Sequence, residues 1–481
     1  MSQNMLPRHI PLPIPNELLQ ETVSKSKDWM VAHGCAMRKK NDYSEDTVQI
    51  VPFIVLPSTI PRKEFNKVVR LQTVLNELMH RVAHDHTFLE ECFKDAIEVD
   101  DFSANLFKIY EAVREEGICQ AISVGLFRSD YLLHSASNNV LKQVELNTVS
   151  ASFSGIGPCI SQFHRYILEE LGHHDKIKNL PENNALTGSA QGLLDAWKLY
   201  GDSDSIIIFL VEEITHNICD QRMHEFEIRR LNPRVKVLRR TFTDIYERAS
   251  LNANKELIID GYTVGLVYFR IGYEPANYPS QKDWDARLLI ERSRALKCPS
   301  ILYHLAGQKK VQQALAQPGV VDRYLTETDK INAIKELFVG LYGLEFNEMG
   351  ERAVQMALSE PERFVLKPQR EGGGFNKYGQ DVKKFMLEVQ NSKERTAWIM
   401  MERIQPPTVM GYAVIAGQPN PPPLKEMVSE LGIYGVLIGS ADKINVNEQV
   451  GHLVRTKSSS MDEGGILAGA GALDSPYLID L

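Results

Sequence analysis

The sequence predicts a mixed α/β protein, and two patterns lead to this prediction. Between about 203 and 300, short apolar runs rich in β-branched residues alternate with helical patterns, which is typical of a parallel sheet covered by helices. From about 60 to 120, apolar residues recur at i, i+3 and i+4, as they do in amphipathic helices. The chain has 481 residues, 43% of them hydrophobic and 24% charged, so it can bury a large core spread over more than one domain.

In the first part of the chain, we expect an arm, then helices, then two strands. Residues 1–20 are rich in proline and are expected to form an arm on the surface. After the helical region, the apolar runs at 121–128 and 141–147 predict strands. A loop of small residues then leads into a helix predicted at 158–171.

The rest of the chain alternates between predicted strands and helices. The runs that predict parallel strands are 205–211, 235–238 and 263–270. From 330 to 405 the sequence predicts a helix, the strand "RFVLK", a glycine loop, a second helix and the strand "WIMMERI". Residues 406–423 have the composition of an irregular connector, and "GHLVRTK" (451–457) predicts a further strand.

Charge and targeting signals narrow the classes of partner. The formal net charge of −8 argues against nucleic acid or an anionic membrane as a partner. No apolar run approaches the roughly 18 residues of a membrane span, and the N-terminus lacks the apolar segment of a signal peptide. The six cysteines lie far apart without a CxxC pair, so we expect reduced, mostly buried thiols and a cytoplasmic protein.

The segment "LKPQREGGG" (366–374) places a lysine, an arginine and a glutamate directly before three glycines. Lys367 can reach a phosphate from the end of an apolar strand, and Glu371 can reach a magnesium ion that bridges phosphates. Glycines allow backbone N–H groups to close over phosphoryl oxygens, although a flexible linker is the alternative. The chain has no G-x-x-x-x-G-K-[ST] motif and no G-x-G-x-x-G after a strand, which argues against a Walker-type loop and a dinucleotide fold.

Two strand patterns place polar side chains on one face. Because side chains alternate along a strand, "LKQVELN" projects Gln143, Glu145 and Asn147 to one side, where their oxygens can bind magnesium. In the same way, "VRTK" places Arg455 and Lys457 together, and like charges so placed need shared anions or water. Taken alone, each pattern is more often a polar face in contact with solvent.

Two further clusters are weaker signals. Lys309 and Lys310 begin a predicted helix, where lysines fit poorly unless an anion binds, and two solvated lysines are the alternative. His80, His84 and His86 include an i, i+4 pair that could bind zinc. Without a clear fourth ligand, we expect these histidines to be exposed.

Longer stretches of the chain resemble the eukaryotic glutathione synthetases, a family of ATP-grasp ligases. The stretches that carry the resemblance run over nearly the full length and are "FRSDY", "LKQVELNTVSASF", "DQR", "VYFRIGY", "ARLLIERS", "KCPS", "AGQKKVQQ", "RFVLKPQREGGG", "SELGIYG" and "GHLVRTK". The resemblance implies a circularly permuted ATP-grasp fold with an inserted parallel α/β substrate-binding domain and a mobile lid. The implied parts are an N-terminal part of the core with the helical region (1–204), the substrate-binding domain (205–312) and a C-terminal part of the core (313–481), which includes the lid (about 340–410) and a glycine and alanine loop (458–472).

The resemblance also implies an activity. It is the ATP-dependent ligation of γ-glutamylcysteine with glycine through an acyl phosphate, which gives glutathione, ADP and phosphate. Magnesium is the implied cofactor, ATP the co-substrate and a homodimer the implied assembly. Two alternatives stay open: a related ligase that uses β-alanine or another small amino acid, and a non-catalytic ATP-binding homologue.

Family positions carry over to this sequence residue by residue. The positions that match magnesium ligands are Glu145, Asn147 and Glu371. The positions expected to act in catalysis are Arg128, Lys309, Lys367 and Arg455. The positions expected around ATP are Glu145, Lys309, Lys367, Glu371, Gly372, Gly373, Gly374, Asn376, Tyr378, Met401, Glu402, Ile404, Glu430, Lys457 and Glu463. The positions expected around the peptide and the acceptor are Arg128, Val149, Ser150, Ala151, Ser152, Thr215, Asn217, Gln221, Arg270, Gly272, Tyr273, Arg455, Ile466 and Leu467.

Three positions depart from the family pattern. Thr215 stands where an acidic residue is common, which weakens one contact to the peptide. Glu463 stands where aspartate is usual, a difference of one methylene near ATP. Leu467 replaces a small residue, as in plant relatives that accept β-alanine, whereas Ala468 keeps the usual small residue, and we expect glycine as the acceptor.

Overall fold

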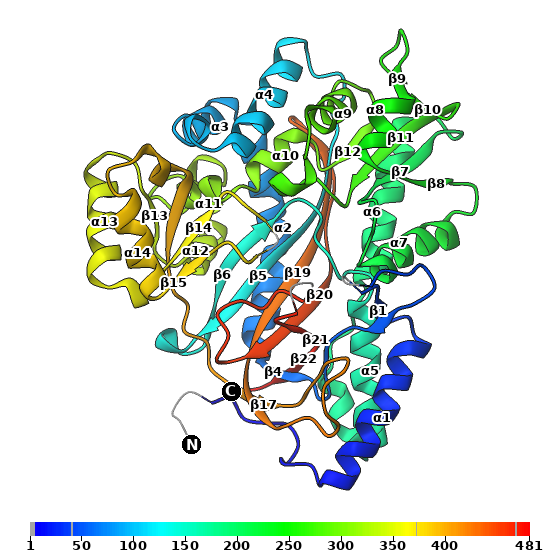
Figure 1. Cartoon of the computed structure of the whole chain (residues 1–481), viewed down its shortest axis with the longest axis vertical. Coiled ribbons are helices and arrows are strands. Elements are labelled where there is room, and N and C mark those ends of the chain that lie inside the picture. Colours follow the sequence, from blue (N-terminus) through cyan, green and yellow to red (C-terminus); the bar gives the residue numbers. More distant parts are fainter. Residues whose placement is uncertain (1–4, 40–41, 372, 467–468) are drawn as a thin grey trace.

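The computed structural model describes residues 5–39, 42–371, 373–466 and 469–481, and it is a mixed α/β structure, as the sequence predicts. Its largest sheet runs through the middle of the molecule, with a long orange and red hairpin at its centre (Figure 1). In sheet order the strands are β18 (Ala413–Val414), β3 (Phe53–Ile54), β21 (Ala472–Asp474), β20 (Lys443–Ser458), β19 (Lys425–Ser440), β5 (Ser123–His134) and β6 (Val140–Asn147), and β17 (Val409–Gly411) also pairs with β19.

Helices cover both faces of this central sheet, because alternate residues of its strands point to opposite sides. In β19, Leu431 and Ile433 are buried on one face, whereas Tyr434 and Val436 are buried on the other. The helices on the first side are α2 (Arg62–Ala83), α3 (His86–Phe93) and α4 (Asp101–Glu115), and those on the second side are α1 (Asn16–Ala32), α5 (Gly157–Glu170) and α6 (Ala185–Tyr200). The helical region predicted from 60 to 120 and the helix predicted at 158–171 are therefore confirmed.

A second sheet, green in Figure 1, lies beside the central one. Its parallel strands are β8 (Val237–Arg240), β7 (Ile206–Leu210), β11 (Tyr262–Phe269) and β12 (Leu296–Cys298), which confirms the predicted parallel arrangement. An antiparallel extension that the sequence did not reveal consists of β10 (Leu257–Ile259) and β9 (Ala249–Leu251). The helices that follow these strands are α7 (Ile218–Leu231), α8 (Phe242–Arg248) and α9 (Gln281–Glu291).

A third sheet carries the glycine loop and lies on the opposite side of the central strands, in yellow (Figure 1). In sheet order its strands are β13 (Leu341–Gly343), β16 (Trp398–Glu402), β14 (Phe364–Pro368) and β15 (Lys377–Tyr378). It shares a core with α13 (Glu348–Ser359) and α14 (Gln380–Val389). The helices that connect the second sheet to the third are α10 (Ile301–Ala306), α11 (Lys309–Leu315) and α12 (Thr328–Leu337).

Segments near the two ends of the sequence lie side by side. In the central sheet, β21 pairs with β3 in parallel, with Leu473 opposite Phe53. Next to it, β22 (Pro476–Ile479) pairs in parallel with β4 (Ser58–Pro61). The central sheet is thus built from strands that are hundreds of residues apart.

Two predictions about irregular segments are wrong. The proline-rich start of the chain is not a surface arm, because Leu6, Ile10 and Ile14 are buried and α1 already begins at Asn16. The alternation of prolines with apolar residues lets an extended segment pack its side chains into the core without helix or sheet. The expected irregular connector at 406–423 contains β17 and β18.

A small separate sheet pairs β1 (Ala36–Met37) with β2 (Gln49–Ile50).

The expected exposure of the histidine cluster is wrong for His80, while His84 and His86 are half-buried. His80 is buried, its Nδ1 lies 2.6 Å from the Tyr303 hydroxyl, and its Nε2 lies 2.9 Å from the Ser440 carbonyl oxygen. Burial lowers the pKa of His80 to about 4, so the ring is neutral at physiological pH. The six cysteines are free, but only Cys35 and Cys298 are buried, so the expectation of mostly buried thiols holds only in part.

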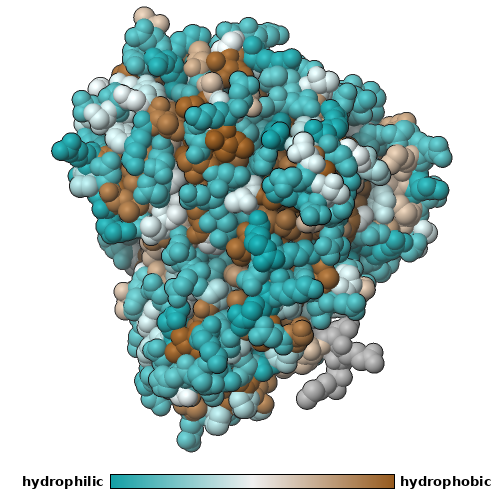
Figure 2. All heavy atoms as spheres, turned by 180° about the vertical axis from the view of Figure 1, so that it is seen from behind, coloured by the Kyte–Doolittle hydropathy of each residue, from teal (hydrophilic) through white to brown (hydrophobic). Residues whose placement is uncertain are grey.

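On the face seen in Figure 2, hydrophilic residues predominate and hydrophobic ones form small separate groups. Among the residues that the structure describes, no helix combines the length and the apolar character that a membrane span requires.

Candidate functional site

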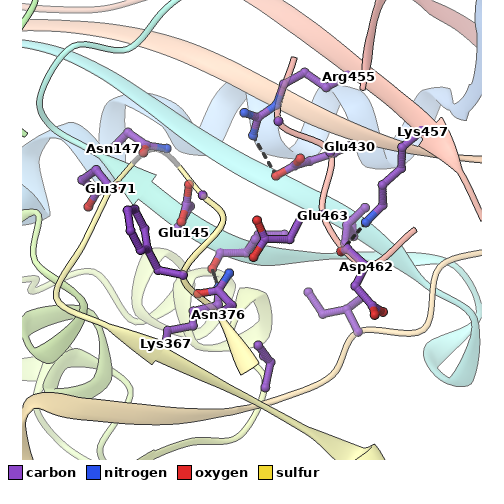
Figure 3. Close-up of a pocket in the computed structure, with 18 of the residues that line it drawn as sticks. Glu145, Asn147, Lys367, Glu371, Asn376, Glu430, Arg455, Lys457, Asp462 and Glu463 are labelled. Atoms are coloured by element: carbon purple, nitrogen blue, oxygen red, sulfur yellow. Dashed lines mark hydrogen bonds and ion pairs between the residues drawn. The ribbon is translucent and has the colours of Figure 1, made fainter. Parts of the chain in front are cut away.

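A cavity of about 330 Å³ lies where the central sheet faces the sheet of the glycine loop. Its walls come from β5 and β6, from β14 to β16 with the loop between them, and from β19 and β20 with the loop that follows. Charged side chains from β6, β14, β19, β20 and the loops after β14 and β20 lie around it (Figure 3). The formal net charge of the chain is −8, yet cationic side chains gather locally at this cavity. The sequence did not reveal that these side chains belong to one group.

One end of the cavity holds two carboxylates around a single ammonium group. The Nζ of Lys309 lies 3.0 Å from Glu145 Oε2 and 3.0 Å from Glu371 Oε1. Burial favours the protonated form of Glu145, but Lys309, Lys367 and Arg455 outweigh it and hold the pKa of this carboxyl far below its usual range. Burial raises the pKa of Glu371 to about 7. Lys309 opposes this rise and the negative charge of Glu145 adds to it.

The two lysines that begin α11 have different roles. Lys309 points to the cavity, whereas Lys310 forms an ion pair with Glu345 beside the third sheet. Lys367, from β14, is buried and donates to the carbonyl oxygen of Val144 at 3.0 Å. Burial lowers the pKa of Lys367, in spite of the opposing charge of Glu145.

A bulge in the β5–β6 pair changes the predicted face of "LKQVELN". Glu145 lies opposite Asp130, but the next pair is Gln143 with Tyr131, so Val144 has no partner of its own. As a result Gln143 donates to the Ser129 hydroxyl at 2.7 Å, and only Glu145 and Asn147 face the cavity. The prediction that all three side chains share one face is wrong for Gln143.

A second charged cluster lies farther along the same wall. The guanidinium of Arg128 donates to both oxygens of Asp130, from Nε at 2.7 Å and from Nη2 at 2.8 Å. Arg455 donates to Asp130 at 3.0 Å and forms an ion pair with Glu430 at 3.0 Å. Figure 3 shows this Arg455–Glu430 pair. The repulsion expected between Arg455 and Lys457 is thus relieved by carboxylates of the protein itself.

The glycine loop contacts the loop after β20. Gly373 and Gly374 have φ values of 76° and 85°, a region that favours glycine, and the N–H of Gly374 donates to Glu463. Asn376 donates to the Tyr378 hydroxyl at 3.3 Å, and Lys457 donates to the carbonyl oxygen of Asp462. Gly372, which is also expected near ATP, lies outside the described residues.

Part of the wall expected around ATP is apolar. Val365, Met401 and Ile404 form a small core cluster with Tyr378 packed against it. Glu402, at the end of β16, lines the cavity and accepts a hydrogen bond from the N–H of Gly340 at 3.2 Å. A flat aromatic base fits between such side chains through dispersion and burial.

The residues expected around the peptide divide into two groups. Those that line the cavity are Arg128, Val149, Ser150, Ala151, Ser152, Tyr273, Arg455 and Ile466, while Leu467 lies outside the described residues. The loop between β6 and α5 (148–156), which contains Ser150 and Ser152, is called the serine loop below. Arg270 contacts this loop and donates to the Ser152 hydroxyl at 2.8 Å. Thr215 and Gln221 both accept hydrogen bonds from Arg239, each at 2.8 Å. Asn217 donates to Asp220 at 3.1 Å, and Gly272, with a φ of 96°, donates its N–H to Asn277 at 3.0 Å.

Several residues that hold the site together were missed from the sequence. Asp220 is fully buried and accepts hydrogen bonds from the N–H groups of Phe153 at 2.9 Å and Gly155 at 2.8 Å, so it fixes the serine loop to α7. The others are Asp130, Arg239 and Tyr434, whose hydroxyl donates to the Ser152 carbonyl oxygen at 2.6 Å. Strand alternation after Arg128 could have revealed Asp130, but no local pattern reveals a contact between distant segments.

The donor set at Glu145, Asn147 and Glu371 fits a magnesium ion. The oxygens of both carboxylates converge on the same Lys309 ammonium, so one cation can contact both. The amide nitrogen of Asn147 donates to Asp130 at 3.0 Å, which leaves its carbonyl oxygen for a cation. Hard oxygen ligands of this kind suit magnesium. In the described part of the chain, no group of three or more His, Cys, Asp or Glu residues is suited to hold a metal ion. The set at this cavity has only two carboxylates, because its third expected ligand, Asn147, is an amide.

Comparison with known proteins identifies the family. The family model described as "Eukaryotic glutathione synthase, ATP binding domain" matches residues 16–478. Glutathione synthetase from Xenopus laevis is 40% identical over 467 residues, which cover 96% of this chain and 98% of the relative, and the Homo sapiens enzyme is 39% identical over 463 residues, covering 95% and 97%. The chloroplastic glutathione synthetase of Arabidopsis thaliana is 37% identical over 475 residues, covering 97% of this chain and 86% of the relative.

Comparison of folds agrees with this result. The structure of a glutathione synthetase-like effector from Globodera pallida, in its apo form, superposes with a TM-score of 0.77 and covers 97% of this chain and 98% of the effector. At 24% identity this match shows a common fold and no more. The full-length similarity of the sequences, with the match of the family model, establishes the relationship. The chain belongs to the eukaryotic glutathione synthetase family of ATP-dependent ligases.

Proposed function

We propose that the chain joins γ-glutamylcysteine to glycine at this cavity, at the expense of ATP, to give glutathione, ADP and phosphate. The observation that carries the proposal is the row of opposite charges along one wall. Glu145, Glu371 and Lys309 form one charged cluster. Arg128, which contacts Ser152, and Arg455 belong to a neighbouring cluster around Asp130. This arrangement supports phosphate chemistry next to a site for a peptide carboxylate.

In the first step, the cysteinyl carboxylate attacks the γ-phosphorus of ATP, which forms an acyl phosphate and releases ADP. Phosphoryl transfer needs positioning and charge neutralisation more than covalent help from the protein. Lys309 and Lys367 are buried ammonium groups at the phosphate end and neutralise phosphoryl oxygens. Glu145, Asn147 and Glu371 would hold a magnesium ion, which would supply further charge neutralisation for the phosphates.

In the second step, the amine of glycine attacks the acyl carbon and loses a proton, and phosphate leaves. The developing oxyanion needs donors that are already in place. Arg128 has its Nε and Nη2 held by Asp130, so its Nη1 remains beside the serine loop, 3.2 Å from the Ser152 carbonyl oxygen. This nitrogen is our candidate donor to the oxyanion.

Exclusion of water is required, because an acyl phosphate in contact with water hydrolyses. We infer that the third sheet and its glycine loop, within the segment of about 340–410, act as the lid of a circularly permuted ATP-grasp fold. The contact between Gly374 and Glu463 supports a loop that closes over the cavity. The domain limits at 204/205 and 312/313 belong to the same proposal.

The test is a reaction of the purified chain with ATP, magnesium and γ-glutamylcysteine, with glycine and β-alanine supplied in parallel. ADP and the mass of the tripeptide are measured in each reaction. We expect the glycine tripeptide, formed in equal amount to ADP. A β-alanine product would keep the mechanism and change the acceptor, as Leu467 allows. Nucleotide binding without either product would contradict the proposed activity.

The homodimer and the cytoplasmic location stay predictions. Light scattering during gel filtration measures the mass of the assembly directly, and a mass near that of the 54.4 kDa chain would contradict the dimer. Microscopy of the tagged chain in its own cells tests the location, which deserves the measurement because the Arabidopsis thaliana relative is named as chloroplastic.

A further inference from the structure

We propose that Asp130 is a positioning residue, which fixes the geometry of three groups that act in the reaction without touching the substrates itself. The inference rests on the proposed function and extends it by one residue. Asp130 is 1% exposed and lies in β5, two residues after Arg128. Its two carboxylate oxygens accept hydrogen bonds from side chains on three different strands.

The contacts of Asp130 are directed to residues of the site. Arg128 donates through Nε and Nη2, at 2.7 and 2.8 Å, in the bidentate geometry that fixes a guanidinium plane. Asn147 donates from β6 at 3.0 Å and Arg455 donates from β20 at 3.0 Å. One buried carboxylate therefore orients the candidate oxyanion donor, a magnesium ligand and a second cation of the cavity.

The backbone around Asp130 is arranged to make room for this carboxylate. Gly432 of β19 lies directly opposite Asp130. A Cβ at Gly432 would lie 2.8 Å from Asp130 Oδ1 and 2.9 Å from Arg128 Cδ, closer than side-chain atoms normally approach. An alanine at this position would displace the Arg128–Asp130 pair without removing either charge.

Charge balance explains why a carboxylate is needed there. Arg128 is buried and Arg455 is partly buried. Glu430 forms an ion pair with Arg455, whereas the carboxylate that pairs with Arg128 is Asp130. Without Asp130, the Arg128 guanidinium would keep its charge and lose both hydrogen bonds that fix its plane. The guanidinium could then turn toward any nearby acceptor, which would remove its alignment with the reacting carbonyl.

The experiment compares Asp130→Asn and Gly432→Ala with the wild type, by kcat, by KM for each substrate and by the affinity for ADP without magnesium. We expect kcat to fall by about 10- to 100-fold in both variants, as it does when a group that orients a catalytic ligand is removed. The dissociation constant of ADP should change by less than about threefold, because the apolar wall at Met401 is untouched. A purely structural defect would instead lower the thermal midpoint, and kcat and the affinity for ADP would fall together.

Two matched variants serve as controls. Asp474→Asn alters a carboxylate that is equally buried but bonds Ser58 and Thr456, away from the cavity. Gly192→Ala places a Cβ 2.7 Å from Val436 in the core and so tests the effect of crowding alone. Both controls should keep kcat within about threefold of the wild type, whatever their stability.

The outcomes separate this inference from the proposed function. If the wild type forms no tripeptide, the proposed function fails and the role of Asp130 fails with it. If the wild type ligates but Asp130→Asn and Gly432→Ala keep more than about half of its kcat, only the role of Asp130 is overturned. If the variants lose activity and ADP affinity in proportion to their stability, Asp130 is structural and the inference is wrong.

Discussion

Arg370 forms a bidentate ion pair with Asp100, with nitrogen–oxygen distances of 2.5 and 3.1 Å. Asp100 also caps the N-terminus of α4, where it accepts the N–H of Ser103 at 2.8 Å. The residue just before Glu371 is therefore tied to the N-terminus of α4 in the helical region. This tie fixes the start of the glycine loop in the arrangement that the structure shows.

Loss of this ion pair should loosen the loop. We expect Arg370→Gln to raise KM for ATP by about tenfold, since hydrogen bonds between charged groups contribute about 1.5–3 kcal/mol and 1.4 kcal/mol corresponds to a factor of ten. The ratio of ADP to tripeptide should also rise, because a loose loop admits water to the acyl phosphate. Steady-state kinetics with both products measured gives the two numbers.

The control for Arg370→Gln is a substitution of Lys393, which lies between α14 and β16. Lys393 pairs with Glu98, but the two side chains are 71% and 51% exposed. Exposed pairs contribute little, so Lys393→Gln should leave KM and the product ratio unchanged. Equal effects of the two substitutions would contradict a specific role for the Arg370–Asp100 pair.

The buried lysine of β14 should be essential for turnover. Lys367→Met removes the charge but keeps the length of the side chain, and we expect kcat to fall by about 10²- to 10³-fold because a preorganised donor to the phosphoryl group is lost. Thermal unfolding should show that the fold is intact. Near-normal turnover in this variant would contradict the assignment of Lys367 to the phosphates.

A second buried lysine provides the comparison for Lys367. Lys297 is 4% exposed and donates to the Ser293 carbonyl oxygen at 2.6 Å, and burial lowers its pKa to about 8. Lys297→Met therefore removes a buried ammonium of the same kind outside the cavity. We expect changed stability with kcat within about threefold of the wild type.

Two glycines with the same backbone strain test the glycine loop. Gly374 and Gly319 have φ values of 85° and 81°, and a Cβ added at either would meet nothing within 4 Å. Alanine at each position should destabilise the protein similarly, by about 1–2 kcal/mol. Only Gly374→Ala should raise KM for ATP, because Gly374 donates to Glu463 at the cavity. Equal KM values in both variants would argue against closure of this loop over nucleotide.

Stability should fall in acid through buried neutral histidines. Burial lowers the pKa of His164 to about 3, where its ring contacts Ser475 Oγ at 2.7 Å and the Ile54 carbonyl oxygen at 2.8 Å. In the unfolded chain the pKa returns to about 6.5, so the unfolded state binds more protons between these values. The stabilising contribution of neutral His164 is therefore full above pH 6.5 and is lost as the pH falls toward 3.

Urea unfolding at pH 7.5 and pH 5.0 measures this effect. The free energy of unfolding of wild type minus His164→Gln should be smaller at pH 5.0 by about 2 kcal/mol, the value for a proton bound over about 1.5 pH units. The glutamine variant has no titrating group at this position. A difference that does not change with pH would contradict the neutral, buried state of His164.

Local periodicity predicted most of the helices and the parallel strands, because these depend on residues near one another in the chain. The site positions at Glu145, Asn147, Lys309, Lys367, Glu371 and Arg455 were predicted from short motifs and from the family resemblance, and the structure brings them to one cavity. Thr215 and Gln221 are predicted beside the peptide, and this stays a prediction; in the structure both accept hydrogen bonds from Arg239.

What could not be predicted depends on contacts between distant segments. The bulge at Val144 follows from the pairing of β6 with β5, and alternation within β6 alone gives the wrong face for Gln143. His80 was expected in solvent because its burial requires Tyr303 and Ser440, which are more than two hundred residues away. The hydrogen bonds around Asp130 likewise include one from Arg455, which lies 325 residues later.

The strand order of the central sheet has a consequence for how the chain folds during synthesis. β5, which carries Arg128 and Asp130, has β19 as its neighbour, and β19 lies about three hundred residues downstream. Until the ribosome has released the hairpin of β19 and β20, one edge of β5 has no partner strand. The cluster of Arg128, Asp130 and Arg455 is then incomplete. Non-local pairing of this kind slows folding and leaves a partly made chain prone to aggregation. The enzyme therefore becomes competent only after translation has passed β20, and chaperones that cover open strand edges should bind the nascent chain before that point.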